Sequence, residues 1–498
     1  MAEGLALLLD PILLFYVVVG VTVCTFVVVV PGLGGTFAIA ILLPFVVRME
    51  PLSGIVLIMA ISAVNGTGNT ITSVLFGIPG SASGVVSTFD GYPMTQRGEG
   101  VRAVTAGLMS SLVGGLIGAA VLAVSLPVLR QIVLAFRPPE FLLLICLALV
   151  VMASVGDGDR LPSLLAAGLG LLLSFVGMEP STATQRWTFG AMYLWDGLHV
   201  VPLILGLYAV AEMIDLLRSG GAITNDTPQH GPWRQIRSGV ADTLRYRRAV
   251  VQSSIAGVWV GMAPGLGDAA AQFVGYGQVA RSSPRGAKFG TGEVEGVIAA
   301  DAATNAKEGG ALIPTLAFGI PGSSAYVLIL AAFLALGVQP GPAMLTDSAH
   351  IVWLIIGVLV LANALAVGLC RVITPALAKV THLDASYVVP PILLASVVGA
   401  YSVNRSYLDV VVLAVFAVVG VAFKATGYSR SMFLIGFVLG PMVERNLLLT
   451  GRIFGWSFLT RPLALLLFSA LVVVILLPLV RRRYRRSRHA TEADEPTG

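Results

Sequence analysis

Long apolar runs separated by short polar segments fill most of this chain. Ten runs approach or exceed the roughly 20 residues that a helix needs to cross a bilayer. Two further stretches, at 34–90 and 250–335, are apolar but are broken repeatedly by Gly, Pro, Ser, Thr and Asn. The pattern predicts an all-α polytopic membrane protein with about 10–14 spans, counting re-entrant or broken helices. The ten runs lie at residues 11–30, 103–129, 138–155, 161–177, 199–217, 350–372, 386–402, 406–423, 430–446 and 460–480.

The two broken stretches carry the same short motifs in the same order. Phe-Gly-Ile-Pro-Gly-Ser stands at 76–81 and again at 318–323, an offset of 242 residues. Pro-Gly-Leu-Gly stands at 31–34 and again at 264–267, an offset of 233 residues. Motifs that return in order at a similar offset indicate an internal duplication, with one repeat in each half of the chain.

Positive charge divides the chain and suggests its orientation. The central polar segment is rich in arginine, and six arginines lie within 481–488. Because basic segments beside spans stay in the cytoplasm, we expect a first membrane repeat at 1–217, a cytoplasmic linker at 218–249, a second membrane repeat at 250–480 and a basic cytoplasmic tail at 481–498. No Lys or Arg precedes the first span, which favours an external N-terminus. An odd number of crossings would then invert the second repeat, as in many secondary transporters.

Composition excludes a single soluble core, because 56% of the residues are hydrophobic and only 11% are charged. Too little polar surface exists to cover such a chain in water. A basic run directly after a span is typical of an anchor on anionic membrane lipid, so we expect no nucleic-acid partner. Cys24, Cys146 and Cys370 lie in apolar runs without metal-ligand spacing, and we expect no metal site and no cofactor.

The repeated breaks indicate a cavity within the membrane. Non-helical backbone at membrane depth must be buried in protein or line a wet cavity, so we expect the two breaks to form halves of one cavity. Helices that begin after the breaks would direct N–H groups at it, which suits an anion such as a carboxylate. Close helix packing is the other explanation for small residues here. The small polar candidates for substrate binding are Asn65, Asn69, Thr70, Ser73, Ser81 and Ser83 in the first half and Asn305, Ser323 and Ser324 in the second.

Ionisable residues within a membrane are by default ion, proton or substrate sites. Asp268, directly after the second Pro-Gly-Leu-Gly, and Asp301 are the candidates for ion coupling, and Thr304 supplies a further oxygen. The residues leave Na⁺ and H⁺ open as the coupling ion. Asp90, within Asp-Gly-Tyr-Pro, is typical of a turn, and Glu295 is typical of an exposed helix start.

Two other functions remain open from the residues alone. Gly80-Ser-Ala-Ser-Gly84 matches the G-x-S-x-G pattern, so one alternative is a membrane-embedded serine hydrolase that uses Ser81 or Ser83. The string follows no predicted strand, however, and a serine nucleophile needs a base. We therefore expect no catalytic residue. A passive anion channel is the other alternative, and the absence of a Walker motif argues against an ATP-driven pump.

Two long segments, at 69–94 and 295–345, resemble the large membrane subunit of the tripartite tricarboxylate transporters. The short segments 138–140, 175–180, 196–212 and 438–447 resemble it too. The resemblance implies a bacterial inner-membrane carrier that imports small carboxylates, either tri- or dicarboxylates, by symport with an ion. It also implies a small membrane subunit and a periplasmic solute-binding protein as partners. The paired breaks suggest an elevator-like cycle.

The resemblance also implies where the substrate binds. The implied positions fall within 65–83 and 264–268, with Asn305 and 319–324 opposite them. This adds three glycines to the candidates: Gly80, Gly265 and Gly322. The chain departs from the pattern at Asp268 and Lys307, where small residues are expected. A charged pair at these positions would alter the substrate or the coupling ion.

Overall fold

The computed structural model describes residues 2–29, 33–77, 79, 81–155, 160–179, 183–219, 232–380 and 385–476. Gly80, much of the predicted linker and the basic tail lie outside these residues. Within them, seven helices are long and apolar enough to cross a membrane, and six shorter apolar helices have 10–17 residues. The described part of the chain contains a single two-stranded sheet. The prediction of an all-α polytopic membrane protein is confirmed.

The first half of the chain forms helices on both sides of the first break. Its elements are α1 Ala2–Ala6, η1 Leu7–Leu9, α2 Pro11–Val29, α3 Gly35–Val46, α4 Pro51–Phe76, η2 Ala82–Gly84, α5 Ser87–Gln96, α6 Gly100–Ala135, α7 Pro138–Val155, α8 Arg160–Ser174, β1 Gly177–Met178, β2 Gln185–Arg186, η3 Met192–Leu194, α9 Val200–Ile204, η4 Leu205–Val210 and α10 Ala211–Ser219.

The second half has the same order of elements around its own break. Its elements are α11 Pro232–Arg245, α12 Arg247–Met262, α13 Gly267–Ser282, η5 Gly286–Lys288, α14 Val294–Phe318, α15 Ser324–Ala335, α16 Pro342–Thr346, α17 Ala349–Val380, α18 Ala385–Asn404, α19 Tyr407–Thr426, α20 Arg430–Leu449, η6 Thr450–Phe454 and η7 Gly455–Thr460. A last apolar helix covers Pro462–Leu476.

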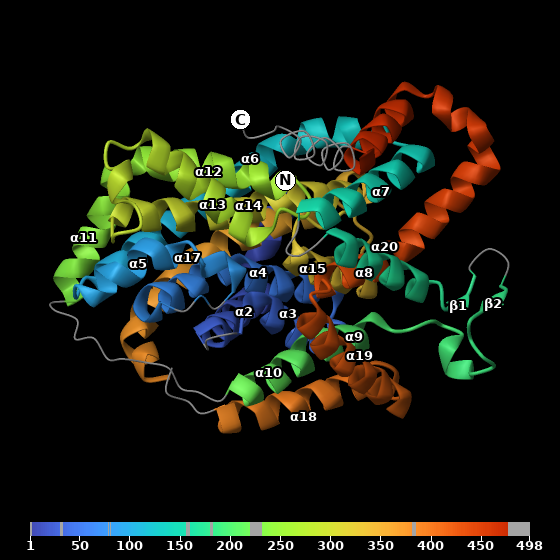
Figure 1. Ribbon diagram of the computed structural model, residues 1–498, viewed down its shortest axis with the longest axis horizontal. Coiled ribbons are helices and arrows are strands. Elements are labelled where there is room, and N and C mark those ends of the chain that lie inside the picture. Colours follow the sequence, from blue (N-terminus) through green and yellow to red (C-terminus); the bar gives the residue numbers. More distant parts are fainter. Residues whose placement is uncertain are drawn as a thin grey trace, which may run out of the picture.

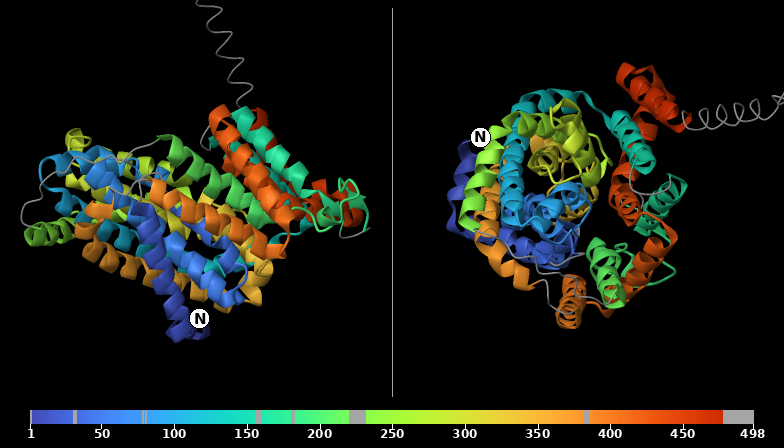
Figure 2. Two further views of the ribbon diagram at one scale, coloured as in Figure 1. Left: turned by 90° about the horizontal axis from the view of Figure 1, so that it is seen from below. Right: turned by 60° about the vertical axis from the view of Figure 1, so that its left-hand side comes forward.

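The helices form two bodies (Figures 1 and 2). We call the ring formed by α1–α6 with α11–α17 the core body, and the group formed by α7–α10 with α18–α20 the flanking body. Each half of the chain therefore contributes to both. Helix α3 packs against α9 and α18, and α15 packs against α20, so these two helices join the bodies.

In the core body, the long helix before each break packs on one helix of its own half and on one helix of the other half. Helix α4 packs on α2 and α17, whereas α14 packs on α12 and α6. In the repeat alignment, α2 corresponds to α12, α4 to α14 and α6 to α17, so the two sets of contacts are equivalent. A duplicated chain folded about a pseudo-twofold axis would make such contacts. The predicted repeat boundaries and the inverted orientation stay predictions.

The two breaks have the same backbone geometry. Helix α4 ends at Gly77 with φ of 68°, and α14 ends at Gly319 with φ of 66°. This left-handed conformation is the usual C-terminal cap of a helix, and it favours glycine. The chain then becomes extended at Ser81 and at Ser323, with φ of −154° and −151°. The identical hexapeptides thus produce identical stops in two buried helices.

The expectation of a turn at Asp90 is wrong, because this residue lies inside α5. Its Oδ1 accepts hydrogen bonds of 2.8–2.9 Å from the backbone N–H groups of Gly290, Gly292 and Glu293. These amides precede α14, so a buried carboxylate of the first half fixes the start of the central helix of the second half. Glu295, expected at an exposed helix start, does lie in the first turn of α14 but is buried.

Replacing Gly319 by Ala tests the cap. A side chain at a left-handed backbone costs roughly 1–2 kcal/mol, so the free energy of unfolding should fall by about that amount. Gly168→Ala in α8 is the matched control, because a Cβ there meets nothing within 4 Å. That change should be neutral or stabilising by about 0.5–1 kcal/mol. Thermal unfolding in detergent measures both, and equal behaviour of the two variants would contradict the role of the cap.

Candidate functional site

The amide of Asn69 joins helix α4 to the chain that follows its break. Its Nδ2 lies 2.7 Å from the Oγ of Ser81 and 2.6 Å from the Oγ of Ser83. The two hydroxyl oxygens lie 2.7 Å apart. One buried side chain therefore holds both predicted serines, and their hydroxyl groups converge on a single point beside α4.

Asn65 makes a second link, from α4 back to the start of α3. Its Oδ1 accepts a hydrogen bond of 2.9 Å from the backbone N–H of Gly35. The contact needs a glycine, because a Cβ at position 35 would lie 2.4 Å from the same oxygen. The segment between the first Pro-Gly-Leu-Gly and α4 is thus held against the polar face of α4.

The two motifs of the second half also meet. The N–H of Gly265, in the second Pro-Gly-Leu-Gly, donates to the carbonyl of Gly322 over 3.3 Å. Gly322 packs closely, since a Cβ there would lie 2.7 Å from the Cβ of Ala311. Ser323 then serves as the N-cap residue of α15, and Ser324 begins that helix half-buried.

Side chains from both halves contact each other between α4 and α14. The Asn305 Nδ2 donates to the Oγ1 of Thr67 over 2.7 Å and to the Oδ1 of Asn363 over 2.8 Å. The Ser87 hydroxyl donates to the Oδ1 of Asp301 over 2.6 Å. Asn305 and Asp301 of α14 thus make hydrogen bonds with side chains of α4, α17 and α5.

Gln272 of α13 completes the link between the halves, and the sequence analysis missed it. Its Nε2 donates to the carbonyl of Ser83 over 2.6 Å, and its Oε1 accepts from the N–H of Val86 over 3.0 Å. Gln272 lies five residues after the second Pro-Gly-Leu-Gly motif, and a single polar residue in a helix gives no local signal of this role. Thr304, by contrast, donates to the Ala300 carbonyl of its own helix over 2.9 Å.

Several polar atoms of this region have no hydrogen-bond partner among the described residues although they are buried. Leaving such an atom unpaired costs about 1–3 kcal/mol, so an accumulation of them at one place indicates a site for a ligand or ion. Four belong to residues that the sequence analysis selected: Asn69 Oδ1, Ser73 Oγ, Asn305 Oδ1 and Ser323 Oγ. The side chains of Thr70 and Asp301, also selected, interact with each other. Thr70 and Asp301 are neighbours, because a Cβ added at Gly107 would lie within 2.6 Å of atoms of both side chains.

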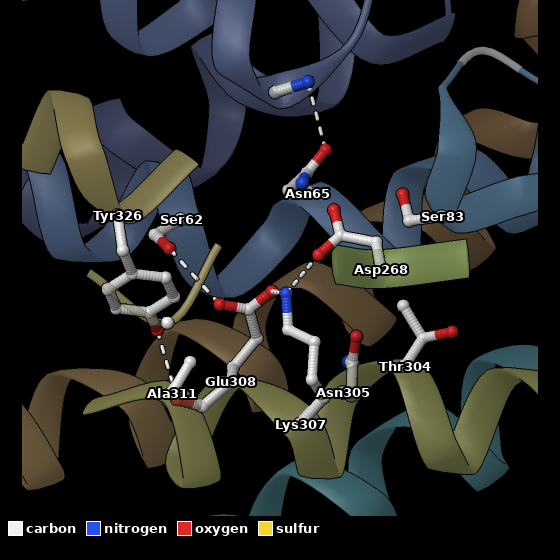
Figure 3. A network of polar contacts seen from close by, with 12 residues as sticks. Ser62, Asn65, Ser83, Asp268, Thr304, Asn305, Lys307, Glu308, Ala311 and Tyr326 are labelled. Atoms are coloured by element: carbon white, nitrogen blue, oxygen red, sulfur yellow. Dashed lines mark hydrogen bonds and ion pairs between the residues drawn. The ribbon is translucent and has the colours of Figure 1, made fainter. Parts of the chain in front are cut away.

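A buried charged cluster lies beside this region (Figure 3). The Lys307 ammonium forms ion pairs with Asp268 and, over 3.0 Å, with Glu308. Only 1% of the Lys307 side chain and 2% of the Glu308 side chain are exposed. The Ser62 hydroxyl lies 3.4 Å from Glu308 Oε2, and the Tyr326 hydroxyl donates to the Glu308 carbonyl over 3.0 Å. Asp268 and Lys307, where the sequence analysis expected small residues, therefore form a direct pair, and we call Asp268, Lys307 and Glu308 the charged triad.

Comparison with known proteins shows the family of the chain. The model of the tripartite tricarboxylate transporter TctA family matches residues 14–435. The chain belongs to this family. An uncharacterized 52.8 kDa protein of Agrobacterium vitis, from the TAR-I ttuC′ 3′ region, is 31% identical over 488 residues, which cover 96% of each chain. A second A. vitis protein, from the TAR-II ttuC′ 3′ region, is 33% identical over 242 residues, which cover 48% of this chain and all of the relative. No solved structure matches.

Membership of the TctA family makes the chain a multi-pass membrane transport protein and not an enzyme. The G-x-S-x-G string is accordingly no nucleophile elbow. Ser83 lies in the 3₁₀ turn η2 after a helix, and the Ser81 and Ser83 hydroxyls contact each other and Asn69. Among the described residues, no group of three or more His, Cys, Asp or Glu side chains is placed to hold a metal ion.

Most of the polar region of this TctA family member is shielded from solvent. Asn65, Asn69, Ser83, Asn305 and Ser323 are buried, whereas Ser81, Ser324 and the segment 262–270 are half-buried. A hollow of about 530 Å³ lies between the β1–β2 hairpin, α8 and α20. Another of about 440 Å³ lies between α12 and α13 and is lined in part by Leu266 of the second Pro-Gly-Leu-Gly motif.

Removing the ammonium of Lys307 should strongly destabilise the protein. Lys307→Met removes the ammonium that contacts both Asp268 and Glu308, and breaking a buried ion pair in this way costs about 3–5 kcal/mol. Lys424→Met is the control, because that side chain is 50% exposed in its pairs with Glu212 and Asp215, and exposed pairs contribute at most about 1 kcal/mol. Thermal unfolding in detergent compares the stability of the two variants. An equal loss of stability in both would contradict the claim that the charged triad stabilises the fold.

Proposed function

We propose that this chain is the large membrane subunit of a binding-protein-dependent secondary transporter. It imports small carboxylates, either tri- or dicarboxylates, and couples their uptake to an ion gradient. The observation that carries the proposal is the group of unpartnered buried polar atoms beside the two matched breaks. Family membership supports the same class of function.

The carboxylate binds between the two breaks in this proposal. The hydroxyl groups of Ser81 and Ser83 converge beside α4, and Ser323 lies at the start of α15. Hydroxyl and amide donors suit a carboxylate, because hydrogen bonds to a charged acceptor are about twice as strong as neutral ones. The positive end of the α15 dipole adds a favourable field at the same place.

The coupling ion binds next to the substrate. The buried side-chain oxygens of Asn69, Thr70 and Asp301 are hard ligands of the kind that Na⁺ accepts, and Asp301 can also accept a proton. The charged triad provides a second acidic site. Either ion would lower the cost of burying an anionic substrate, which is the physical basis of symport here.

Transport follows an elevator-like movement in this proposal. The candidate residues that the structure describes lie on elements of the core body or on the chain between those elements. Of the helices that join the bodies, α15 begins at the second break, and α3 packs on both α4 and α15. Movement of the core body against the flanking body would therefore displace the site and open it to solvent in the same step.

The partners and the location follow from the family and the charge pattern. We place the chain in the bacterial inner membrane with its basic C-terminus in the cytoplasm. A periplasmic solute-binding protein delivers the carboxylate, and a small membrane subunit completes the complex. An uptake assay therefore has to include both partners together with this chain.

Uptake into proteoliposomes tests the proposed function. Vesicles contain this chain and the small membrane subunit, and the binding protein is loaded with labelled citrate or with one of a panel of dicarboxylates. Na⁺ and proton gradients are imposed separately. Ser81→Ala combined with Ser323→Ala should lower uptake at low substrate by at least roughly tenfold, because each lost charged hydrogen bond is worth about 1.5–3 kcal/mol.

The control carries Ser125→Ala and Ser154→Ala, two hydroxyl groups that bond only to the carbonyls of their own helices. It should transport like the unmodified protein. Absence of uptake under both gradients, with a loaded binding protein, would overturn the transporter proposal for these substrates. Normal uptake by the first variant would move the substrate site away from the breaks.

A further inference from the structure

The charged triad carries an excess of one negative charge. It holds one ammonium and two carboxylates, and Lys307 and Glu308 are almost fully buried. Burying an uncompensated charge costs far more than burying a paired one. The closed arrangement therefore calls for one further positive charge on these three residues.

The internal repeat shows which contact of the triad has an equivalent in the first half of the chain. Gly35 and Asn65 of the first half correspond to Asp268 and Lys307 of the second, through the offsets of 233 and 242 residues. The first pair is joined by a neutral hydrogen bond and the second by an ion pair. The Asp268–Lys307 pair is thus the charged counterpart of a structural link. Each pair connects the helix after Pro-Gly-Leu-Gly to the helix before the break.

Glu308 has no such counterpart, because the equivalent residue in the first half is Gly66. Asp268 lies in the first turn of α13, where the helix dipole stabilises a negative charge. Glu308 lies in the middle of α14, away from any helix end. Of the two carboxylates, Asp268 therefore keeps its negative charge beside Lys307. The uncompensated negative charge of the triad falls on Glu308.

The groups that face Glu308 offer no other cation. Tyr326 faces it from α15 and Cys24 from α2, and both are neutral in their usual forms. Ser62 faces it from α4, and a hydroxyl can either donate to a carboxylate or accept from a protonated acid. Helices α6 and α12 pack on this part of α14 through Gly118 and Gly261. Among the described residues around Glu308, Lys307 is the only basic side chain.

We propose that Glu308 carries the coupling proton, so that the transporter is driven by a proton gradient. This inference rests on the proposed function and names its ion. While the triad is sealed, Asp268 is ionised, Lys307 is protonated and Glu308 holds a proton on one carboxyl oxygen, so the cluster is neutral. When the core body opens, the Glu308 O–H bond breaks, the proton passes to water, and the solvated cluster carries one negative charge.

The exposed edge of the triad gives the route for this proton. The Asp268 side chain is 12% exposed, whereas Glu308 is nearly inaccessible. The residues around Asp268, from 262 to 270, are all half-buried. A small opening at this second Pro-Gly-Leu-Gly segment therefore brings water to the triad without unfolding α14.

Infrared spectroscopy of the purified chain at neutral pH tests the proposal independently of transport. The unmodified protein should show the carbonyl stretch of a buried protonated carboxyl group. Glu308→Gln should remove that band. Asp268→Asn should remove it too, because Glu308 is then ionised against Lys307, which keeps the test valid if the first variant folds poorly. Glu295→Gln, the same change at a buried acid of the same helix, should leave the band in place.

Uptake of labelled citrate and dicarboxylates separates this inference from the proposed function. Glu308→Gln should lower proton-driven uptake at least tenfold, whereas Glu295→Gln should not. An unchanged infrared band, or uptake by Glu308→Gln driven by Na⁺ alone as in the unmodified protein, would overturn the proton assignment and leave the transporter standing. Failure of the unmodified complex to transport under any gradient would instead count against the proposed function.

Discussion

Backbone polar groups that a helix break releases within a membrane must be buried in protein, and the rest of this structure depends on that constraint. Two long helices, α4 and α14, stop at glycines in the left-handed conformation in the middle of the fold. Each stop is buried by helices of the core body, including elements from the other half of the chain. The same burial collects the short polar side chains that flank the breaks into one region. Fold and site therefore share one cause.

The charged triad shows how a duplicated scaffold becomes asymmetric. At equivalent positions, one half uses a glycine amide and an asparagine, and the other uses an aspartate and a lysine. Geometry is conserved between the halves while electrostatics is not. A duplicated scaffold can thus keep one half neutral for an anion and place an ionisable group in the other. Glu308, whose counterpart in the first half is a glycine, adds a carboxyl group that takes no part in the link between Asp268 and Lys307.

Much of this could be predicted from the sequence, because hydropathy and exact motif repeats are strong signals. The polytopic helical class, the two breaks and the choice of Asn69, Ser81 and Ser83 as candidate site residues follow from them. The two-body arrangement does not, since every apolar helix has the same pattern whichever body it joins. The role of Asp90 was misjudged because its neighbours are typical of a turn, whereas its three amide partners come from 200 residues away. Gln272 was missed because one polar residue in a helix carries no local signature.

The central claim is that the two breaks form the two halves of one carboxylate site. A structure determined in a lipid nanodisc with saturating carboxylate, at a resolution that resolves side chains, tests it most directly. The account predicts density for the anion between Ser81 and Ser323, within hydrogen-bond distance of both hydroxyl groups. Density confined to the hollow beside the β1–β2 hairpin, with the polar region between α4 and α14 still closed and empty, would contradict it.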